Sequence, residues 1–439
     1  MDKLVIEGKH FLEGELPVSG SKNTALTLMA ASILADGATD LSNIPDLRDI
    51  NTFSRVIEVS GASVNFDPVT HQMVIDASSI DHPEAPYELV KRMRASFYML
   101  GALLGRCGKA RVSLPGGCAW GPRPVDLHLS GLKAFGASID LEQGYVLAHA
   151  PGGRLAGGRF HLHPSSVGAT INLLLGAVTA RGASKIEGAA IEPDVVVFCR
   201  ALETMGAQLE GIGTSTLEIE GVRTLSATSL MNCPDRIEMG TFMIAAGLAG
   251  RPGVPVRITG ADTTHLGESF LTAFAETGIL IQEGNQYVDV VAPHSLNPVS
   301  IQTGVFPGFP TDLQAQWTVL LTQAEGNAKV VDTIYFDRFK HIPELRRMGV
   351  NAIVVGNEVV IEGKIPLQGA KVMSTDLRAS VSLVLAGMVA EGTTEVQRIY
   401  HLDRGYEMLE TKLARAGISI WRERYDEFAD PIISQVPDA

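Results

Sequence analysis

The sequence predicts an α/β protein of two pseudo-symmetric domains, each made of three repeated units with helices inside and sheets outside. First, a glycine followed by Ala, Ile or Val closes a helix-like segment about every 70 residues. Second, each interval holds β-like and helix-like segments in one order, which indicates a βαβαββ unit. Third, the first helix of a unit is apolar nearly all round, as buried helices are. The closing glycines are Gly61, Gly136, Gly206, Gly278, Gly349 and Gly417.

The length and composition agree with two domains. The chain has 439 residues, of which 45% are hydrophobic, so it can bury more than one core. We place one domain at residues 22–232 and the other at residues 1–21 plus 233–439, with 422–439 as an appended polar tail. The first β segment, residues 4–17, is expected to pair with the C-terminal half, so that the chain crosses between the domains twice.

Each unit begins with a short polar sequence that leads into a helix of small residues. These helix starts are residues 21–23, 93–96, 165–168, 235–238, 311–314 and 375–378. The helices at 169–178, 241–249 and 379–390 are the most apolar, and we expect them to be buried. Glycine costs about 1 kcal/mol against alanine inside a helix, so its frequency there indicates tight packing between helices.

A charged turn precedes the second, amphipathic helix of most units. These turns are residues 47–49, 123–126, 192–194, 337–338 and 403–404, and the fourth unit, around Thr263, lacks the pattern. Because a cleft between two such domains is a common place for a ligand, helix starts and charged turns that face it are candidate binding positions.

Cations occupy equivalent places in several units. A helix N-terminus carries about +0.5 charge and free N–H groups, which favours anions. An acidic chain with net charge −13 that repeats cations at such places is expected to bind phosphate or carboxylate groups there. The alternative is that each cation is a surface ion-pair partner. The six cations are Lys22, Arg94, Arg123, Arg338, Arg378 and Arg404.

Asp312 is the acidic member of this set. A carboxylate among cations ionises easily and can accept a proton from a substrate hydroxyl. The alternative is that Asp312 caps the helix that begins at Leu313.

Cys118 lies in a loop rich in glycine and proline between residues 112 and 129. Gly117 precedes it and Arg123 follows five positions later, a setting that lowers a thiol pKa from about 8.5 towards neutrality. We therefore consider Cys118 a candidate reactive thiol, against the alternative of a small buried hydrophobic residue.

The composition also excludes several classes of function. A net charge of −13 argues against nucleic acid as the main ligand. Four scattered cysteines and eleven dispersed histidines have no metal-ligand spacing, and no phosphate-binding or dinucleotide-binding fingerprint occurs. The chain has no signal-like start and no apolar run long enough for a membrane span. We expect a soluble, cytoplasmic protein with no metal, nucleic acid or membrane partner.

In these motifs the chain closely resembles the enolpyruvyl transferases, from Leu4 to about Arg422. The resemblance implies the inside-out α/β barrel of EPSP synthase, in which two domains close over the substrates. The Pro-Gly-Gly-Cys sequence that ends at Cys118 is typical of the branch that acts on a sugar nucleotide. The matching segments are residues 19–23, 93–96, 114–118, 123–128, 166–170, 309–312, 376–380 and 398–407.

The resemblance implies which residues bind each substrate. Lys22, Arg123, Arg378 and Arg404 would hold the phosphate and carboxylate of phosphoenolpyruvate, and Asn23 would lie beside the reacting groups. A further set would contact UDP-N-acetylglucosamine or line its site. That set is Arg94, Arg123, Pro124, Val125, Asp126, Leu127, Pro164, Ser165, Ser166, Val167, Gly168, Asp312, Ile334 and Arg338.

The resemblance also implies the chemistry. Cys118 would act as general acid and form a covalent adduct with phosphoenolpyruvate, Asp312 would take the proton of the sugar 3′-hydroxyl, and Lys22 and Arg404 would assist catalysis. No cofactor is implied. The reaction would be the first committed step of peptidoglycan synthesis, and fosfomycin would alkylate Cys118.

Two alternatives stay open. His163 and Pro164 stand where this family usually has an acidic residue and a lysine, which removes a cation expected near the nucleotide phosphates. The first alternative is therefore an enolpyruvyl transferase with another nucleotide acceptor such as UMP. The other alternative is a non-catalytic sensor that binds a nucleotide sugar.

Overall fold

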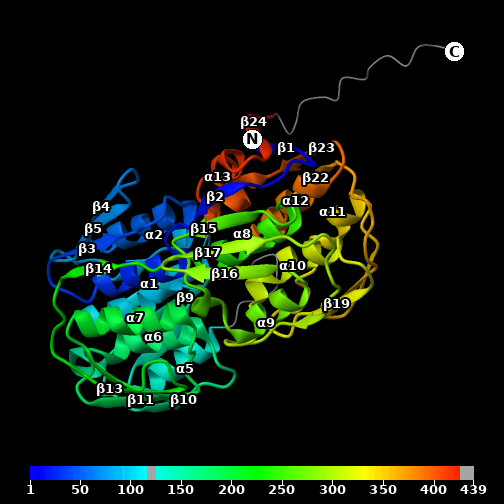
Figure 1. Ribbon diagram of the computed structural model, residues 1–439. Helices are drawn as coiled ribbons and strands as arrows, with labels where there is room; N and C mark the ends of the chain where they lie inside the picture. Colours follow the sequence, from blue (N-terminus) through cyan, green and yellow to red (C-terminus); the bar gives the residue numbers. More distant parts are fainter. Residues whose placement is uncertain (92, 116–124, 426–439) are drawn as a thin grey trace.

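The computed structural model describes residues 1–91, 93–115 and 125–425 of the chain. These residues form two lobes, each with its own hydrophobic core (Figure 1). We call the lobe whose core holds residues 25–230 the first lobe. The second lobe has a core of residues 4–16 and 237–420.

The strands in the described parts of the first lobe form three four-stranded sheets. Each sheet has one parallel strand pair followed by two antiparallel pairs. In spatial order the sheets are β14 (Ser229–Met231), β3 (Ala38–Ser42), β5 (Gln72–Asp76), β4 (Ser63–Asp67); β6 (Glu84–Ala85), β7 (Lys109–Ser113), β9 (Tyr145–His149), β8 (Ser138–Glu142); and β10 (Arg159–His161), β11 (Ala183–Glu187), β13 (Thr216–Glu220), β12 (Gln208–Glu210).

The second lobe repeats this topology in the three sheets that its described residues form. They are β2 (Gly14–Pro17), β15 (Pro255–Thr259), β17 (Tyr287–Val291), β16 (Leu280–Gly284); β18 (Ile301–Gln302), β19 (Ala328–Val331), β21 (Glu358–Ile361), β20 (Ala352–Val355); and β22 (Lys371–Met373), β23 (Thr393–Gln397), β1 (Asp2–Glu7), β24 (Ser419–Arg424).

The N-terminal segment completes two sheets of the second lobe. β1 pairs with β23 and β24 in the register Leu4↔Val396 and Leu4↔Arg422, and β2 pairs with β15. In Figure 1 the blue strand β1 therefore lies among the red C-terminal strands. The predicted pairing of residues 4–17 with the C-terminal half is confirmed, although the segment makes two strands in two sheets.

The expected C-terminal tail begins too early. Residues 422–424 belong to β24, because they pair with Leu4, Lys3 and Asp2 of β1. The part of the tail at 426–439 lies outside the described residues.

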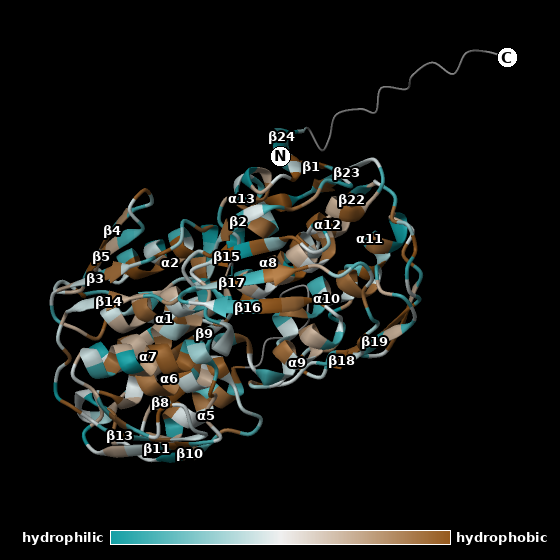
Figure 2. Ribbon diagram, viewed as in Figure 1, coloured by the Kyte–Doolittle hydropathy of each residue, from teal (hydrophilic) through white to brown (hydrophobic). Residues whose placement is uncertain are grey.

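The helix that opens each unit is buried at the centre of its lobe, as predicted (Figure 2). Small residues allow this packing. A Cβ atom added to Gly101 or Gly105 of α4 would collide with the backbone oxygen of Asn172 or Leu175 in α6. The buried helices are α1 (Lys22–Ser32), α4 (Met99–Cys107), α6 (Val167–Ala177), α8 (Arg236–Ala249), α10 (Gln314–Leu321) and α12 (Leu377–Val389).

The second helix of each unit is amphipathic and ends at the repeated glycine. The six glycines have φ between +89° and +102°, a conformation that a side chain disfavours, which explains why glycine recurs there. These helices are α2 (Arg48–Val59), α5 (Asp126–Ala134), α7 (Pro193–Thr204), α9 (Glu268–Glu276), α11 (Ile342–Arg347) and α13 (Leu409–Arg415). Shorter turns are α3 (Tyr87–Val90), η1 (Arg94–Tyr98), η2 (Pro151–Gly153), η3 (Thr263–Leu266), η4 (Thr311–Leu313) and η5 (Ile399–Arg404).

Two segments of the described chain join the lobes and lie side by side. The Ser21 N–H donates to the carbonyl of Cys233 at 2.7 Å, and the Asp235 N–H donates to the carbonyl of Ser19 at 2.8 Å. These bonds place the start of α1 beside the start of α8, at the junction of the lobes.

Candidate active site

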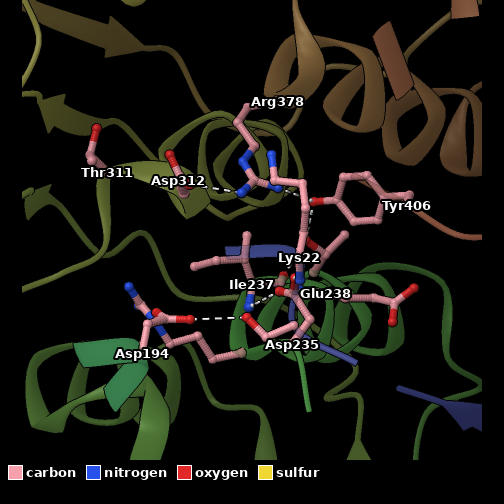
Figure 3. A network of polar contacts seen from close by, with 12 residues as sticks. Lys22, Asp194, Asp235, Ile237, Glu238, Thr311, Asp312, Arg378 and Tyr406 are labelled. Atoms are coloured by element: carbon pink, nitrogen blue, oxygen red, sulfur yellow. Dashed lines mark hydrogen bonds and ion pairs between the residues drawn. The ribbon is translucent and has the colours of Figure 1, made fainter. Parts of the chain in front are cut away.

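Asp312 lies in η4, where two arginines of the second lobe hold its carboxylate. The Arg338 guanidinium donates from Nη2 to Oδ1 at 2.6 Å, and the Arg378 guanidinium donates from Nη2 to Oδ2 at 2.7 Å. Arg378 comes from the first turn of α12 and also donates from Nη1 to the Tyr406 hydroxyl at 3.4 Å. Figure 3 shows Asp312 and Tyr406 on either side of the Arg378 guanidinium. We call Asp312, Arg338 and Arg378 the Asp312 cluster.

The charge state of Asp312 follows from these contacts. Burial raises the pKa of a carboxyl group, but Arg378 and Arg338 outweigh it and hold the pKa of Asp312 well below its usual range. Its side chain keeps 30% of its surface exposed, so the ionised group also faces solvent. The alternative that Asp312 caps the helix at Leu313 is wrong, because its carboxylate oxygens bind the two arginines and η4 and α10 have no side-chain cap.

Asp49 holds a second pair of predicted cations. It lies in the first turn of α2, and its Oδ1 accepts from Arg404 Nε at 2.9 Å. Its Oδ2 accepts from Arg404 Nη2 and from the Lys22 ammonium, each at 3.4 Å. Lys22 and Asp49 belong to the first lobe and Arg404 to η5 of the second. We call these three residues the Asp49 cluster.

The pKa of Lys22 is lowered by its surroundings. Burial lowers the pKa of Lys22, Asp49 opposes that effect, and Arg378 and Arg404 lower the pKa further. The Lys22 backbone N–H donates to Asp235 Oδ2 at 3.1 Å, which ties the start of α1 to the start of α8. The surface ion-pair alternative does not describe Lys22, Arg338, Arg378 and Arg404, because their partners lie at the junction rather than on the outer sheets.

A third ion pair supports the start of α1. Asp194 of α7 accepts from Arg236 Nε at 3.0 Å, from Ser21 Oγ at 2.9 Å and from Thr24 Oγ1 at 2.8 Å. Burial opposes ionisation of Asp194, but Arg236 and the two hydroxyl groups lower its pKa overall. Arg236 is the first residue of α8, so this pair also joins the lobes.

The sequence predictions missed Asp49, Asp194, Arg236 and Tyr406 as members of the site. A signal existed for Arg236. It begins α8 directly after the aspartate cap Asp235, and Arg378 likewise lies in the first turn of α12 after the aspartate cap Asp376. Asp49 and Asp194 lie in the predicted charged turns, whose predicted site members are cations. No sequence signal singles out Tyr406, whose hydroxyl meets Arg378, Thr241 and Gln316 only in the folded chain.

In the first lobe, η1, α4, α5 and α6 meet around Asn172 and His128. Asn172 Oδ1 accepts from the Gly101 N–H at 2.6 Å, and its Nδ2 donates to the Phe97 carbonyl and to His128 Nδ1, each at 2.9 Å. Burial, and then Arg94, lower the pKa of His128 to about 3, so the imidazole is neutral. This buried centre fixes three predicted nucleotide-contact segments relative to one another.

Most predicted contact residues for the sugar nucleotide lie at the starts of η1, α5 and α6. Arg94 opens η1, Asp126 and Leu127 open α5 after Val125, and Ser166 caps α6 by accepting from the Ala169 N–H at 3.3 Å. Ile334 lies in the second lobe, 37% exposed, beside Tyr335. The remaining members in this region are Pro164 and Ser165 before α6 and Val167 and Gly168 in its first turn. Asn23, which the resemblance places beside the reacting groups, follows Lys22 in α1.

Cys118, Arg123 and Pro124 lie outside the described residues. In the described residues, groups of three or more His, Cys, Asp or Glu side chains placed to hold a metal ion do not occur. Of the helices in that part of the chain, none combines the length and apolar character needed to cross a bilayer.

The chain is similar to known enzymes over nearly its whole length. Residues 6–413 match the family described as EPSP synthase (3-phosphoshikimate 1-carboxyvinyltransferase). A UDP-N-acetylglucosamine 1-carboxyvinyltransferase of Chloroherpeton thalassium is 49% identical over 432 residues, which cover 98% of this chain and 99% of the relative. The enzyme of that name from Chlorobaculum parvum is 49% identical over 430 residues, covering 98% and 100%.

Solved structures show the same architecture. The enolpyruvyl transferase NikO from Streptomyces tendae has a TM-score of 0.87 and 27% identity, with 96% of this chain and 98% of that chain covered. EPSP synthase from Acinetobacter baumannii has a TM-score of 0.76 and 17% identity, with 97% and 100% covered, and so supports the fold alone. The predicted inside-out α/β fold of six units is confirmed.

Proposed function

The chain belongs to the EPSP synthase family of enolpyruvyl transferases, and from this premise we propose that it transfers the enolpyruvyl group of phosphoenolpyruvate to the 3′-hydroxyl of UDP-N-acetylglucosamine with release of phosphate. The observation that carries the proposal is the gathering of Lys22, Arg404, Arg378 and Arg338 around two carboxylates at the lobe junction. The near-complete coverage of relatives with this activity selects the acceptor.

The cations have a role in substrate binding and in phosphate release. Phosphoenolpyruvate carries a phosphate and a carboxylate, and guanidinium groups bind both through charge-assisted hydrogen bonds. Lys22, Arg378 and Arg404 supply that positive charge within the described residues, and we expect Arg123 to join them. Their charge also stabilises the departing phosphate.

The reaction needs one acid and one base. Cys118 would give a proton to the methylene carbon, which leaves the neighbouring carbon electron-poor. Asp312 would take the proton of the 3′-hydroxyl as its oxygen attacks that carbon. The tetrahedral intermediate then loses phosphate from this carbon and a proton from the new methyl group, which restores the double bond.

Asp312 is a weak base while two guanidiniums hold it. If phosphoenolpyruvate draws Arg378 toward its own anionic groups, Asp312 loses one of the cations that lower its pKa. Its basicity then rises when the donor substrate is in place, which couples proton transfer to substrate binding.

Phosphate release tests the acceptor directly. The purified chain is incubated with phosphoenolpyruvate and, in separate reactions, with UDP-N-acetylglucosamine, UMP or shikimate 3-phosphate. We expect phosphate release with UDP-N-acetylglucosamine alone. Release only with UMP would establish the alternative nucleotide acceptor, and nucleotide-sugar binding with release in none of the reactions would establish the sensor.

This activity is the first committed step of peptidoglycan synthesis, and we place it in the cytoplasm. Fosfomycin provides a second test, because an epoxide that reaches the Cys118 thiol adds its mass to the chain. We expect one adduct by intact mass measurement, together with loss of turnover. An unchanged mass with full activity would contradict the assigned role of Cys118.

A further inference from the structure

Asp49 is a buried acid whose carboxylate contacts two residues of the proposed reaction and has no place in its proton transfers. Its side chain is 6% exposed, and its three polar contacts go to Arg404 and Lys22. One carboxylate oxygen serves Arg404 Nε, and the other is shared between Arg404 Nη2 and Lys22 Nζ. One acid therefore determines the separation of these two cations.

Within the described residues, Lys22 and Arg404 each keep donors that Asp49 does not engage, and these can meet an anion. Lys22 Nζ has three donors, of which Asp49 engages one among the described residues. Arg404 uses Nε and Nη2 for Asp49, and its side chain keeps 31% of its surface exposed. Asp49 thus engages some of the N–H donors of Lys22 and Arg404, and their other donors remain for an incoming phosphate or carboxylate.

The three residues come from different elements of two lobes. Lys22 is in α1, Asp49 in α2 and Arg404 in η5, so no single element can set their spacing. Arg404 reaches Asp49 only where η5 of the second lobe lies against α2 of the first. The Asp49 carboxylate therefore links the geometry of the cation pair to the relative position of the lobes.

We propose that Asp49 is a positioning residue for enolpyruvyl transfer, whose carboxylate holds the Lys22 ammonium and the Arg404 guanidinium at the spacing that clamps phosphoenolpyruvate. This proposal rests on the proposed function and adds to it a residue that touches neither substrate. Asp49 also offsets the repulsion between the Lys22 and Arg404 cations before the anionic substrate arrives.

The test compares Asp49→Asn with Asp49→Glu and with Glu58→Gln, an exposed substitution on the same helix. For Asp49→Asn we expect the KM for phosphoenolpyruvate to rise at least about tenfold while the KM for UDP-N-acetylglucosamine changes less than about twofold. Asp49→Glu recovers part of the loss because it restores the charge, and Glu58→Gln behaves as wild type.

The pH profile separates positioning from a purely structural role. Without the Asp49 charge, burial together with Arg378 and Arg404 lowers the pKa of Lys22 further, so the alkaline limb of kcat/KM for phosphoenolpyruvate moves to lower pH. An unchanged limb and an unchanged KM in Asp49→Asn would overturn the proposal. Equal loss for both substrates with a lowered Tm would overturn it in favour of a structural role. The wild-type chain is measured in the same assay. If it releases no phosphate, the proposed function fails, whatever the Asp49 variants do.

Discussion

The Asp312 cluster and the Asp49 cluster each place two cations on one carboxylate, but they differ in where their members come from. All three members of the Asp312 cluster belong to the second lobe, and its ion pairs are 2.6 and 2.7 Å long. The Asp49 cluster spans both lobes, with contacts of 2.9 and 3.4 Å. The first is independent of lobe position, and the second depends on it.

Exposure separates the two acids as well. The Asp312 side chain is 30% exposed and the Asp49 side chain 6% exposed. An exposed carboxylate can meet a substrate hydroxyl, whereas a covered one acts on the substrate only through the groups it holds. This difference supports the proposed roles, proton transfer for Asp312 and positioning for Asp49.

The largest expected effect follows from Asp312→Asn. This change removes the charged oxygen that accepts the hydroxyl proton, so we expect kcat to fall roughly 10²- to 10⁴-fold. Steady-state kinetics checks the loss, circular dichroism checks the fold, and Asp262→Asn on the surface serves as control. A rise in the KM for phosphoenolpyruvate with unchanged kcat would make Asp312 equivalent to Asp49 and break the comparison.

A stability measurement tests whether the Arg236–Asp194 ion pair between the lobes stabilises the protein. In Arg236→Met, Asp194 keeps a buried negative charge without its cation, so we expect the free energy of unfolding to fall by about 3 kcal/mol. Denaturant unfolding measures the difference. Arg251→Met, which breaks an exposed pair with Glu13, is expected to cost less than about 1 kcal/mol. Equal losses in the two variants would show that the Asp194 pair does not stabilise the junction.

The smallest effect concerns pH. Arg338→Met removes one of the cations that lower the pKa of Asp312, so that pKa rises toward its ordinary value. Since Asp312 must be ionised to accept a proton, the acid limb of kcat/KM moves to higher pH. Because the ordinary pKa of an aspartate is about 3.9, we expect the extra loss of activity to stay below about twofold at pH 4 relative to pH 8 and to grow only at lower pH. Arg346→Met is the matched control. An acid limb that stays at the wild-type position in Arg338→Met would contradict the assignment of Asp312 as the base.

Local sequence patterns predicted much of the fold because each unit repeats the same helix start and the same closing glycine. The six glycines recur because each takes a positive φ after an amphipathic helix. The small-residue helices are buried because their backbones approach each other closely, as Gly101 and Gly105 do against α6. The tail boundary failed because pairing with β1, more than 400 residues away, extends β24 to Arg424.

For the site, the sequence indicated Lys22, Arg338, Arg378, Arg404 and Asp312, because helix starts and charged turns recur at equivalent places. It could not pair these cations with their carboxylates. Asp49 and Arg404 are separated by 355 residues and meet only through lobe packing.

By itself, then, the sequence determined the repeating unit, the buried helices and the kinds of charge that line the junction, since these depend on local conformation and on periodicity. Only the tertiary structure decided which acid holds which cation, because ion pairing depends on distances between elements from different units. That choice separates Asp312, held within one lobe and open to solvent, from Asp49, covered and shared between two lobes.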